Sequence, residues 1–200
     1  MRENTYKKLD NLKNSNNGYV DTAALIELGY TNRQILALVK EGRLEKVSYG
    51  YYWVVDSRYQ KPYDYKAVEV GLVNPGAVIC GMSACYFHGL IPNEPKELSV
   101  ATKRSDRHKI QMNFEVKRYF FSDHLFEEGV SVIKTMQGNY RIYDAERSVC
   151  DCIRLKKNIS EESFYVLIEN YKKQTDTDIT RLWKYAELLR SDKQIEKILK

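Results

Sequence analysis

Asp106, Glu115 and Lys117 are the residues whose types and order most directly suggest catalysis. Two acids followed by a lysine, the last pair within Glu115-Val116-Lys117, occur in the order that metal-dependent nucleases use. In such a site carboxylates hold Mg²⁺ and the lysine polarises the attacking water. A Glu-x-Lys tripeptide is very common, however, and one face of an exposed strand explains it equally well. A metal-dependent nuclease is therefore an alternative and not the main expectation.

The four cysteines do not have the spacing of a zinc site. Structural zinc sites favour about two to four residues between paired ligands. Here four residues separate Cys80 from Cys85, and one residue separates Cys150 from Cys152. Cys152 also belongs to an apolar helical stripe. We expect buried, reduced thiols and no bound metal.

The three histidines lack the partners that catalysis would need. His88 is predicted to end a helix, where an imidazole interacts favourably with the last carbonyls, whereas His108 and His124 fall in polar turns. The chain has no nucleophile elbow and no glycine loop that would bind phosphate. We therefore expect no catalytic residue, no cofactor and no enzymatic activity.

A short basic helix gives the strongest binding signal. Thr31 and Gln34 have the spacing of a capping box, in which each side chain satisfies a backbone N–H of the first helical turn. The helix that they open is predicted to cover residues 32–41 and to end before Gly42. Its apolar side chains should pack inward: Ile35, Leu36, Leu38 and Val39. Its remaining side chains should face outward: Asn32, Arg33, Gln34, Ala37 and Lys40.

Such a helix has the composition of a DNA recognition helix. Arginine pairs bidentately with guanine, asparagine or glutamine pairs with adenine, and a helix N-terminus favours phosphate. We expect Asn32, Arg33 and Gln34 to read base edges in the major groove. Five further residues would contact the DNA backbone: Lys40, Arg43, Lys46, Tyr49 and Tyr51. Three residues of a downstream basic loop would extend this surface: Lys103, Arg104 and Arg107.

Two helices are predicted to precede the basic helix. Apolar residues at helical spacing indicate a first helix over residues 3–13. Asp21 is a good N-cap for a second helix over residues 22–28, which Gly29 would end. Because only Gly29 and Tyr30 separate the second helix from the third, the spacing is that of a helix-turn-helix.

A hairpin is predicted to follow the basic helix. The chain alternates over residues 43–47, turns at Ser48-Tyr49-Gly50, and returns over residues 51–55. A hairpin in this place is the wing of a winged helix, which would complete a DNA-binding domain over residues 1–60. The same fold could instead serve only protein contacts, because a fold alone does not fix function.

An ordered series of short motifs resembles one protein family. The N-terminal motifs are Gly18-Tyr19-Val20-Asp21, Leu28-Gly29-Tyr30-Thr31 with Ile35 and Leu38-Val39, and the run from Glu41 to Val47 followed by Gly50 and Tyr52. The later motifs are Met82-Ser83-Ala84, His88-Gly89-Leu90, Leu98-Ser99-Val100, and the run from Tyr143 to Asp151. Together they cover most of residues 18–155 and resemble the AbiEi antitoxins of bacterial abortive-infection toxin–antitoxin operons.

The resemblance implies an autoregulatory repressor. Antitoxins of this family bind inverted repeats in their own promoter through an N-terminal winged helix. Their C-terminal domain counters a partner toxin with a nucleotidyltransferase fold. The system is described as type IV, so a stable complex between antitoxin and toxin is not required.

The remaining residues, 61–200, are predicted to form a mixed α/β domain with a helical C-terminal end. The boundary lies at residues 58–62, and helices are expected over 63–73 and 82–88. Strands are expected over four further segments: 97–102, 113–121, 129–136 and 139–143. The last quarter should hold helices with apolar faces: Ala145, Val149, Cys152 and Ile153 on one, Phe164, Leu167, Ile168 and Tyr171 on another, and Ile179, Leu182, Trp183 and Ala186 on a third.

Charge permits a polyanionic partner without requiring one. The 200 residues carry 32 basic and 27 acidic side chains, a net charge of +5. Residues 96–118 hold seven Lys or Arg and three acids, a net charge of +4, which is nearly the whole excess. No run of apolar residues is long enough to span a bilayer and the first residues form no signal peptide, so we expect a cytoplasmic protein without membrane contact.

These observations together predict an α+β protein that binds double-stranded DNA. The main hypothesis is an antitoxin that represses its own operon at promoter inverted repeats and counters a nucleotidyltransferase-like toxin. A second hypothesis is a protein-interaction module that inhibits the toxin by direct contact and binds no specific DNA. Arg147 and Asp151, one helical turn apart, are expected to form an i,i+4 ion pair.

Overall fold

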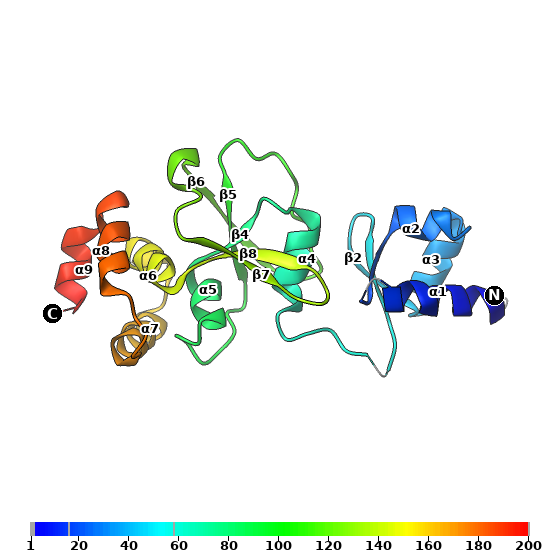
Figure 1. The fold of residues 1–200 in the computed structure, drawn as a ribbon, viewed down its shortest axis with the longest axis horizontal. Helices are drawn as coiled ribbons and strands as arrows, with labels where there is room; N and C mark the ends of the chain where they lie inside the picture. Colours follow the sequence, from blue (N-terminus) through cyan, green and yellow to red (C-terminus); the bar gives the residue numbers. More distant parts are fainter. Residues whose placement is uncertain (1–2, 16, 58, 200) are drawn as a thin grey trace.

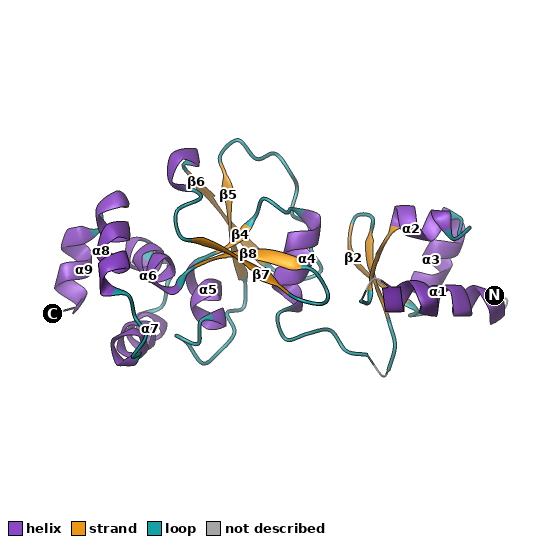
Figure 2. Ribbon diagram, viewed as in Figure 1, coloured by secondary structure: helices purple, strands orange, loops and turns teal. Residues whose placement is uncertain are grey.

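The protein is an elongated α+β structure built from three consecutive parts (Figure 1). A computed structural model describes residues 3–15, 17–57 and 59–199. An N-terminal module lies at one end, a five-stranded sheet with two helices lies in the middle, and a group of helices forms the other end (Figure 2). Among the described residues, no helix is both long and apolar enough to cross a membrane.

The N-terminal module packs three helices on one face of a small antiparallel sheet with strand order β1-β3-β2. Its elements in chain order are α1 (Glu3–Ser15), β1 (Tyr19–Asp21), α2 (Thr22–Glu27), α3 (Asn32–Lys40), β2 (Leu44–Ser48) and β3 (Tyr51–Val54). The three helices and the hairpin agree with the sequence predictions. Strand β1 was not predicted, because three residues are too few to show an alternating pattern. It pairs with β3, with Tyr19 opposite Trp53 and Asp21 opposite Tyr51.

Local capping explains where α2 and α3 begin. The Asp21 carboxylate accepts a hydrogen bond from Ala24 N at 2.8 Å. Thr31 and Gln34 form the predicted capping box around the first turn of α3. Gly42 follows α3 with a φ of +69°, a conformation that other residues rarely adopt, so the helix ends there and the chain turns into β2.

The inward face of α3 is narrower than the sequence predicts. Ile35 and Leu38 are buried together with Leu25 and Val54 in the core of the module. Leu36, which was expected to pack inward, is 61% exposed. The prediction was wrong because Leu36 lies about 100° around the helix from Ile35 and points to solvent when only one side of the helix is covered.

The central part is a mixed sheet with strand order β6-β5-β4-β8-β7. Its strands are β4 (Val78–Ile79), β5 (Leu98–Lys103), β6 (Val116–Phe121), β7 (Val130–Lys134) and β8 (Asn139–Tyr143). Strand β4 pairs antiparallel with β5 and parallel with β8. It was not predicted because it is two residues long, and yet it is the strand on which the sheet is centred. Strands β6 and β7 are shorter than expected.

Two helices cover one face of this sheet. Helix α4 (Tyr65–Val73) and helix α5 (Gly81–Phe87) bury Val68 and Ala84 against Val100 and Ile142 of the strands. Gly71 lets α4 approach β8, because a Cβ atom there would lie 2.3 Å from the carbonyl oxygen of Asn139. On the opposite face, Phe126 and Tyr143 pack in a separate small cluster beside the short 3₁₀ helix η1 (Asp123–Leu125).

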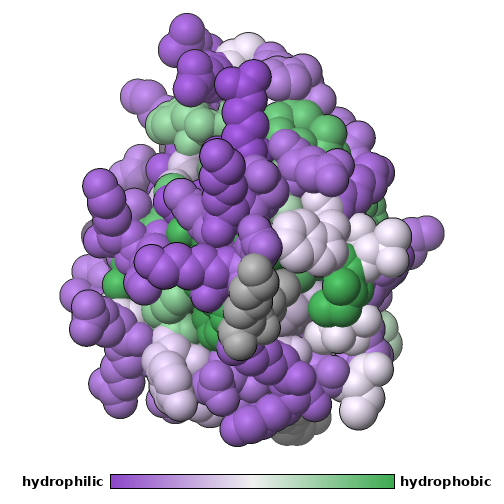
Figure 3. All heavy atoms as spheres, turned by 90° about the vertical axis from the view of Figure 1, so that its left-hand side faces the viewer, coloured by the Kyte–Doolittle hydropathy of each residue, from purple (hydrophilic) through white to green (hydrophobic). Residues whose placement is uncertain are grey.

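The C-terminal helices form their own core. They are α6 (Ala145–Arg154), η2 (Lys156–Asn158), α7 (Glu161–Lys173), α8 (Ile179–Leu188) and α9 (Asp192–Leu199). The predicted apolar face of α7 is buried as expected: Phe164, Leu167, Ile168 and Tyr171. In α8 the prediction was partly wrong, because Tyr185 is buried while Ile179 is 47% exposed. The end of the molecule that these helices form is mostly hydrophilic, with apolar patches between charged side chains (Figure 3).

The N-terminal module and the central part share one continuous core. Tyr19, Val47 and Trp53 of the small sheet are buried in the same cluster as Ala67 and Val70 of α4. The Trp53 ring stacks on Tyr59 of the connecting segment, with ring centroids 5.5 Å apart. The predicted boundary at residues 58–62 lies between β3 and α4, with Arg58 outside the described residues.

Candidate nucleic-acid interface

The outward face of α3 carries two exposed cations. Arg33 and Lys40 lie on one side of the helix with Leu36 and Ala37 between them, and both cations are exposed. Within the described part of the chain, neither makes an ion pair. Asn32 is exposed at the first turn, where the backbone N–H groups and the helix dipole favour an anion. The face combines hydrogen-bond donors with an apolar side chain.

The side chain of Gln34 is less free to contact a base than the sequence suggests. Its side-chain oxygen accepts hydrogen bonds from the Thr31 backbone N at 2.8 Å and from the Thr31 hydroxyl at 3.0 Å. Bidentate pairing with adenine needs the oxygen and the nitrogen of the amide together. Gln34 therefore holds the start of α3 in place and could read adenine only by opening the capping box.

The hairpin presents a mixture of exposed and buried residues. Tyr49 at its turn is 91% exposed, and Lys46 is exposed on β2. Arg43 is exposed and its guanidinium lies 5.1 Å from the ring centroid of Tyr6 on α1. Tyr51 was expected to contact a DNA backbone, but it is half-buried in the core shared with the central part. It lies there because alternation turns Tyr51 and Trp53 away from the helices of the module.

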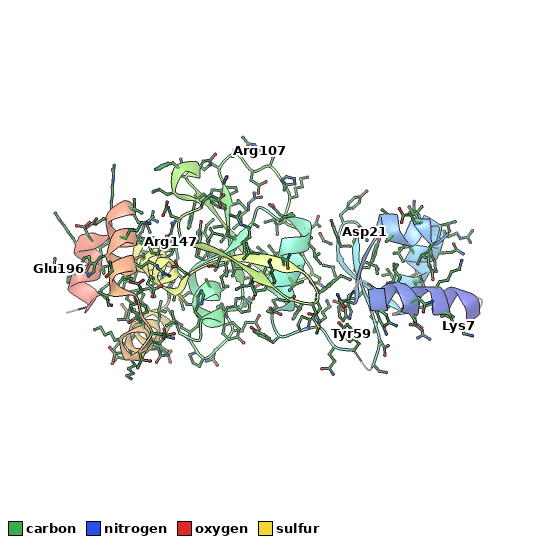
Figure 4. All side chains as sticks on the ribbon, in the orientation of Figure 1. Lys7, Asp21, Tyr59, Arg107, Arg147 and Glu196 are labelled. Carbon is green, nitrogen blue, oxygen red and sulfur yellow. The ribbon has the colours of Figure 1, made fainter. Side chains whose placement is uncertain are left out.

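The predicted basic loop does not form one exposed patch. Arg104 and Arg107 are exposed, whereas Lys103 pairs with Glu127 at 3.1 Å and lies over the ring of Phe126. Figure 4 shows Arg107 at the outer edge of the central part, while α3 belongs to the N-terminal module. The structure therefore brings together two sets of predicted residues, one on the module and one on the sheet, and not a single surface.

The residues proposed for a nuclease are not brought together. Asp106 is held by Arg118 and Asn74 beside one pocket, while Glu115 and Lys117 line another. Glu115 instead pairs with Lys96 at 3.3 Å. Among the residues described, no three His, Cys, Asp or Glu side chains gather as metal ligands would.

All four cysteines are buried, Cys85, Cys150 and Cys152 in the helical core and Cys80 in the small cluster with Phe126 on the central sheet. Cys85 and Cys152 have their sulfur atoms 3.7 Å apart, and the Cys150 thiol points toward the Leu182 carbonyl. Burial raises the pKa of the Cys150 thiol to about 12, which disfavours the thiolate at neutral pH. The His88 imidazole does not bond the last carbonyls of its own helix as expected, since its Nε2 lies 2.7 Å from the carbonyl oxygen of Tyr143 on β8.

Arg147 and Asp151 form the predicted ion pair, with the Arg147 Nε 3.0 Å from a carboxylate oxygen. Both side chains are buried, and Arg147 also donates to the carbonyl oxygens of Leu125 and Glu128. The pair therefore fastens the loop before β7 to helix α6. A partner protein could not touch it without opening the core.

A pocket at one end of the central sheet is not indicated by any pattern in the sequence. Its walls come from the turn after α4, the end of β5 with the following loop, the turn before β7, and β8. Because these segments are far apart in the chain, no spacing rule connects Lys103, Glu127 and Arg141. Only the fold brings them together.

Comparisons with known proteins address the fold alone. No family model matches the chain, and no curated protein matches its sequence. The crystal structure of the RV2827C protein from Mycobacterium tuberculosis is similar, with a TM-score of 0.65 and 13% identity. The match covers 91% of this chain and 75% of that one. At this identity the likeness supports a common fold and carries no activity with it.

Proposed function

We propose that this chain is a DNA-binding repressor of the AbiEi antitoxin type, with a winged helix-turn-helix as its DNA-binding module. The observation that carries the proposal is the outer face of α3, where Arg33 and Lys40 are exposed and form no ion pair with any residue that the structure describes. The hairpin that follows α3 and the motif resemblance support the same function.

In this proposal α3 enters the major groove of double-stranded DNA. Arg33 pairs with a guanine, Asn32 contacts an adjacent base or phosphate, and Lys40 contacts the backbone. Leu36, exposed between the two cations, suits the methyl group of a thymine. The hairpin turn at Tyr49 and the side chains of Arg43 and Lys46 would follow the backbone beside the helix.

Two copies on an inverted repeat would double these contacts. Each chain has a net charge of +5, which is modest for a nucleic-acid binder, and two half-sites one helical turn apart combine the contribution of both. The promoter of the chain's own operon is the proposed site. The central and C-terminal parts would counter a toxin with a nucleotidyltransferase fold, in the cytoplasm and without need of a stable complex.

The test is fluorescence anisotropy on the gene's own upstream region and on a scrambled duplex. The titrations run from about 50 to about 200 mM salt, because phosphate contacts weaken steeply over that range. We expect tighter binding to the native sequence that persists at the higher salt. Equal and salt-labile binding to both duplexes would contradict the proposal.

A matched pair of lysine variants makes the test specific to α3. Lys40 in the last turn of α3 and Lys172 in the last turn of α7 are both exposed. Lys40→Ala should weaken binding and reduce the salt slope by about one, whereas Lys172→Ala should change neither. Equal effects of the two substitutions would show that binding follows net charge and not the α3 face.

A protein-interaction module is a second candidate, and the edge strand β7 favours it. β7 pairs with β8 on one side only, and Val132 on it is 55% exposed. Met136, just beyond the strand, is 76% exposed. An apolar sheet edge can pair with a strand of another protein. Co-purification with the product of the neighbouring gene, surviving high salt, would favour this function over DNA binding.

A further inference from the structure

An open pocket of about 720 Å³ lies where the C-terminal end of β5 meets the N-terminal end of β4. This volume is in the range of small-molecule sites, which span roughly 300–1,000 Å³. The pocket is separate from α3 and from the hairpin, although Lys103 and Arg107, two of the residues predicted to contact DNA, line it. Its lining includes three cations: Lys103, Arg107 and Arg141.

Two of these cations converge on one carboxylate. Lys103 Nζ lies 3.1 Å from Glu127, and the Arg141 guanidinium pairs with the other oxygen of the same side chain. Both cations also lie over the ring of Phe126, at 5.5 and 5.8 Å from its centroid. Because Phe126 is fully buried, it forms a fixed floor beneath the two charges.

Glu127 is the movable member of this cluster. Its side chain is 56% exposed, compared with 21% for Arg141, and it lies in the short turn between η1 and β7. Burial alone would raise the pKa of Glu127, but Lys103 and Arg141 outweigh that effect and lower it. The carboxylate is therefore an anion held between two cations, and it can swing into solvent without disturbing the core.

The opposite wall is fixed before any ligand arrives. Arg118 donates to the carbonyl oxygens of Asp106 and His108, and the Asn74 amide donates to the Asp106 carboxylate at 2.6 Å. These bonds pin the loop that carries Arg107. Arg107 itself is exposed and makes no ion pair among the described residues. A preorganised wall reduces the entropy cost of binding.

We propose that this pocket binds a phosphate group, which takes the place of the Glu127 carboxylate between Lys103 and Arg141. Arg141, whose Nη1 also donates to the Gly76 carbonyl oxygen at 3.2 Å, supplies a charged planar donor that suits a phosphate, and Lys103 supplies a point charge. Arg107 at the rim would meet a second phosphate or the rest of the ligand. The phosphate belongs either to a free small molecule of about mononucleotide size or to a nucleic-acid backbone.

The proposal predicts opposite changes in ligand affinity for substitutions of Glu127 and for substitutions of the two cations. Isothermal titration calorimetry with inorganic pyrophosphate and with AMP, at constant ionic strength, measures binding to the full chain. We expect at least one of the two probes to bind with a Kd below about 1 mM. Arg141→Gln should weaken binding about tenfold or more, because it removes a charged planar donor. Lys103→Gln should also weaken it.

Glu127→Gln should tighten binding about three- to tenfold, since it removes the internal competitor that holds two half-exposed ion pairs. Its neighbour Glu128 pairs with Lys184 at 3.3 Å and does not line the pocket, so Glu128→Gln is the matched control and should leave the Kd unchanged. Circular dichroism and thermal unfolding verify that each variant is folded. Arg141→Lys, which keeps the charge, covers the case in which Arg141→Gln does not fold.

The proposal is overturned if neither probe binds in this range, or if Glu127→Gln and the Arg141 variants leave the Kd unchanged. A scrambled duplex without terminal phosphates distinguishes the two phosphate sources. If the duplex displaces pyrophosphate and binds more weakly to Arg141→Gln, the phosphate is that of a nucleic-acid backbone. If only AMP displaces pyrophosphate, it is that of a small molecule. Because the pyrophosphate titration contains no DNA, its failure and the failure of the repressor proposal are independent.

Discussion

Helices α3 and α6 are alike in length and capping but differ in which side chains they bury. They have nine and ten residues, begin at side-chain N-caps, Thr31 and Asp144, and carry arginine in the first turn. In α3 the buried residues are apolar and the cations face solvent. In α6 the buried set includes four polar residues: Glu146, Arg147, Ser148 and Asp151.

An arginine on an amphipathic helix is therefore a candidate binding residue only once its burial is known. Arg33 is exposed and unpaired within the described residues, so its donors are available to another molecule. Arg147 donates to Asp151 and to two backbone carbonyls, so its donors are used within the fold. Substitutions at the two helices should therefore change different properties of the protein.

The largest effect should come from Arg147→Met. This change leaves the buried Asp151 carboxylate with Arg154 as its remaining partner and frees the carbonyls of Leu125 and Glu128. We expect the free energy of unfolding, measured by denaturant titration, to fall by about 3–5 kcal/mol. Arg154→Met is the control, since its side chain is 39% exposed and its loss should cost only about 0–1 kcal/mol. Similar costs at both positions would contradict the structural role of Arg147.

Removal of the N-cap side chain should also cost more stability at α6 than at α3. Asp144 caps α6 and its other oxygen also accepts a hydrogen bond from the Tyr185 hydroxyl at 2.7 Å, whereas Thr31 caps α3 only. Thermal and denaturant unfolding should give a loss of about 1 kcal/mol for Thr31→Ala and about 2–3 kcal/mol for Asp144→Ala. In the Asp144→Ala background, Tyr185→Phe should recover part of the lost stability, because it removes the hydroxyl that has lost its Asp144 acceptor. If Thr31→Ala were the costlier change, the comparison would fail.

Arg33→Ala should affect binding and not stability. We expect a loss of about 1–3 kcal/mol on the cognate duplex and relaxed specificity, measured by anisotropy. The free energy of unfolding should stay within about 0.5 kcal/mol of the parent, as for other surface changes. Arg33→Lys keeps the charge and loses the bidentate geometry, so it should bind scrambled DNA like the parent. Equal losses on cognate and scrambled duplexes would remove Arg33 as a base reader.

The smallest effect on stability should come from Asp106, whose carboxylate is less buried than Arg147 and less exposed than Arg33. Burial would raise the pKa of Asp106, but hydrogen bonds from His108 and Asn74 and the charge of Arg118 lower it overall. Because the folded-state pKa lies below the unfolded one, the contribution to stability is complete above the ordinary pKa and is lost as pH falls through the lowered value. The parent should therefore be more stable than Asp106→Asn at neutral pH, with a gap that closes in acid.

Denaturant titrations from about pH 6 to about pH 2 measure this gap. Asp176, which is exposed in the loop between α7 and α8, is the matched position, and at neutral pH Asp176→Asn should leave the free energy of unfolding within about 0.5 kcal/mol of the parent. A gap for Asp106→Asn that stayed constant over the whole range would mean that the ionised carboxylate is not what anchors the loop.

Local signals predicted the helices well because caps and stop residues act within one turn. Asp21, the capping box at Thr31 and Gly42 each fix an element boundary through contacts with near neighbours in the chain. The side on which a helix is buried depends instead on what packs against it. Leu36 was misplaced for this reason, and Ile179 on α8 in the same way.

Very short strands and assembled sites could not be predicted. Strands β1 and β4 have three and two residues, too few for a periodic pattern, and exist because longer neighbours offer them hydrogen-bond partners. The Lys103, Glu127 and Arg141 cluster joins β5, a turn and β8 across the sheet. The engaged state of Gln34 and the half-burial of Tyr51 likewise follow from three-dimensional neighbours.

Because the N-terminal module and the central sheet share one core, the two parts should move together as one body. Trp53 of the hairpin is buried against the central part, and Lys61 bridges Glu45 of β2 and the buried Glu69 of α4 at 2.8 and 2.7 Å. Any tilt of the hairpin on a surface must therefore be carried to the far helices as a proportionally larger displacement. On a pair of half-sites, a change of spacing by one base pair would rotate one bound molecule relative to the other by roughly 35° about the DNA axis, and the ends that meet or separate would be those farthest from the DNA.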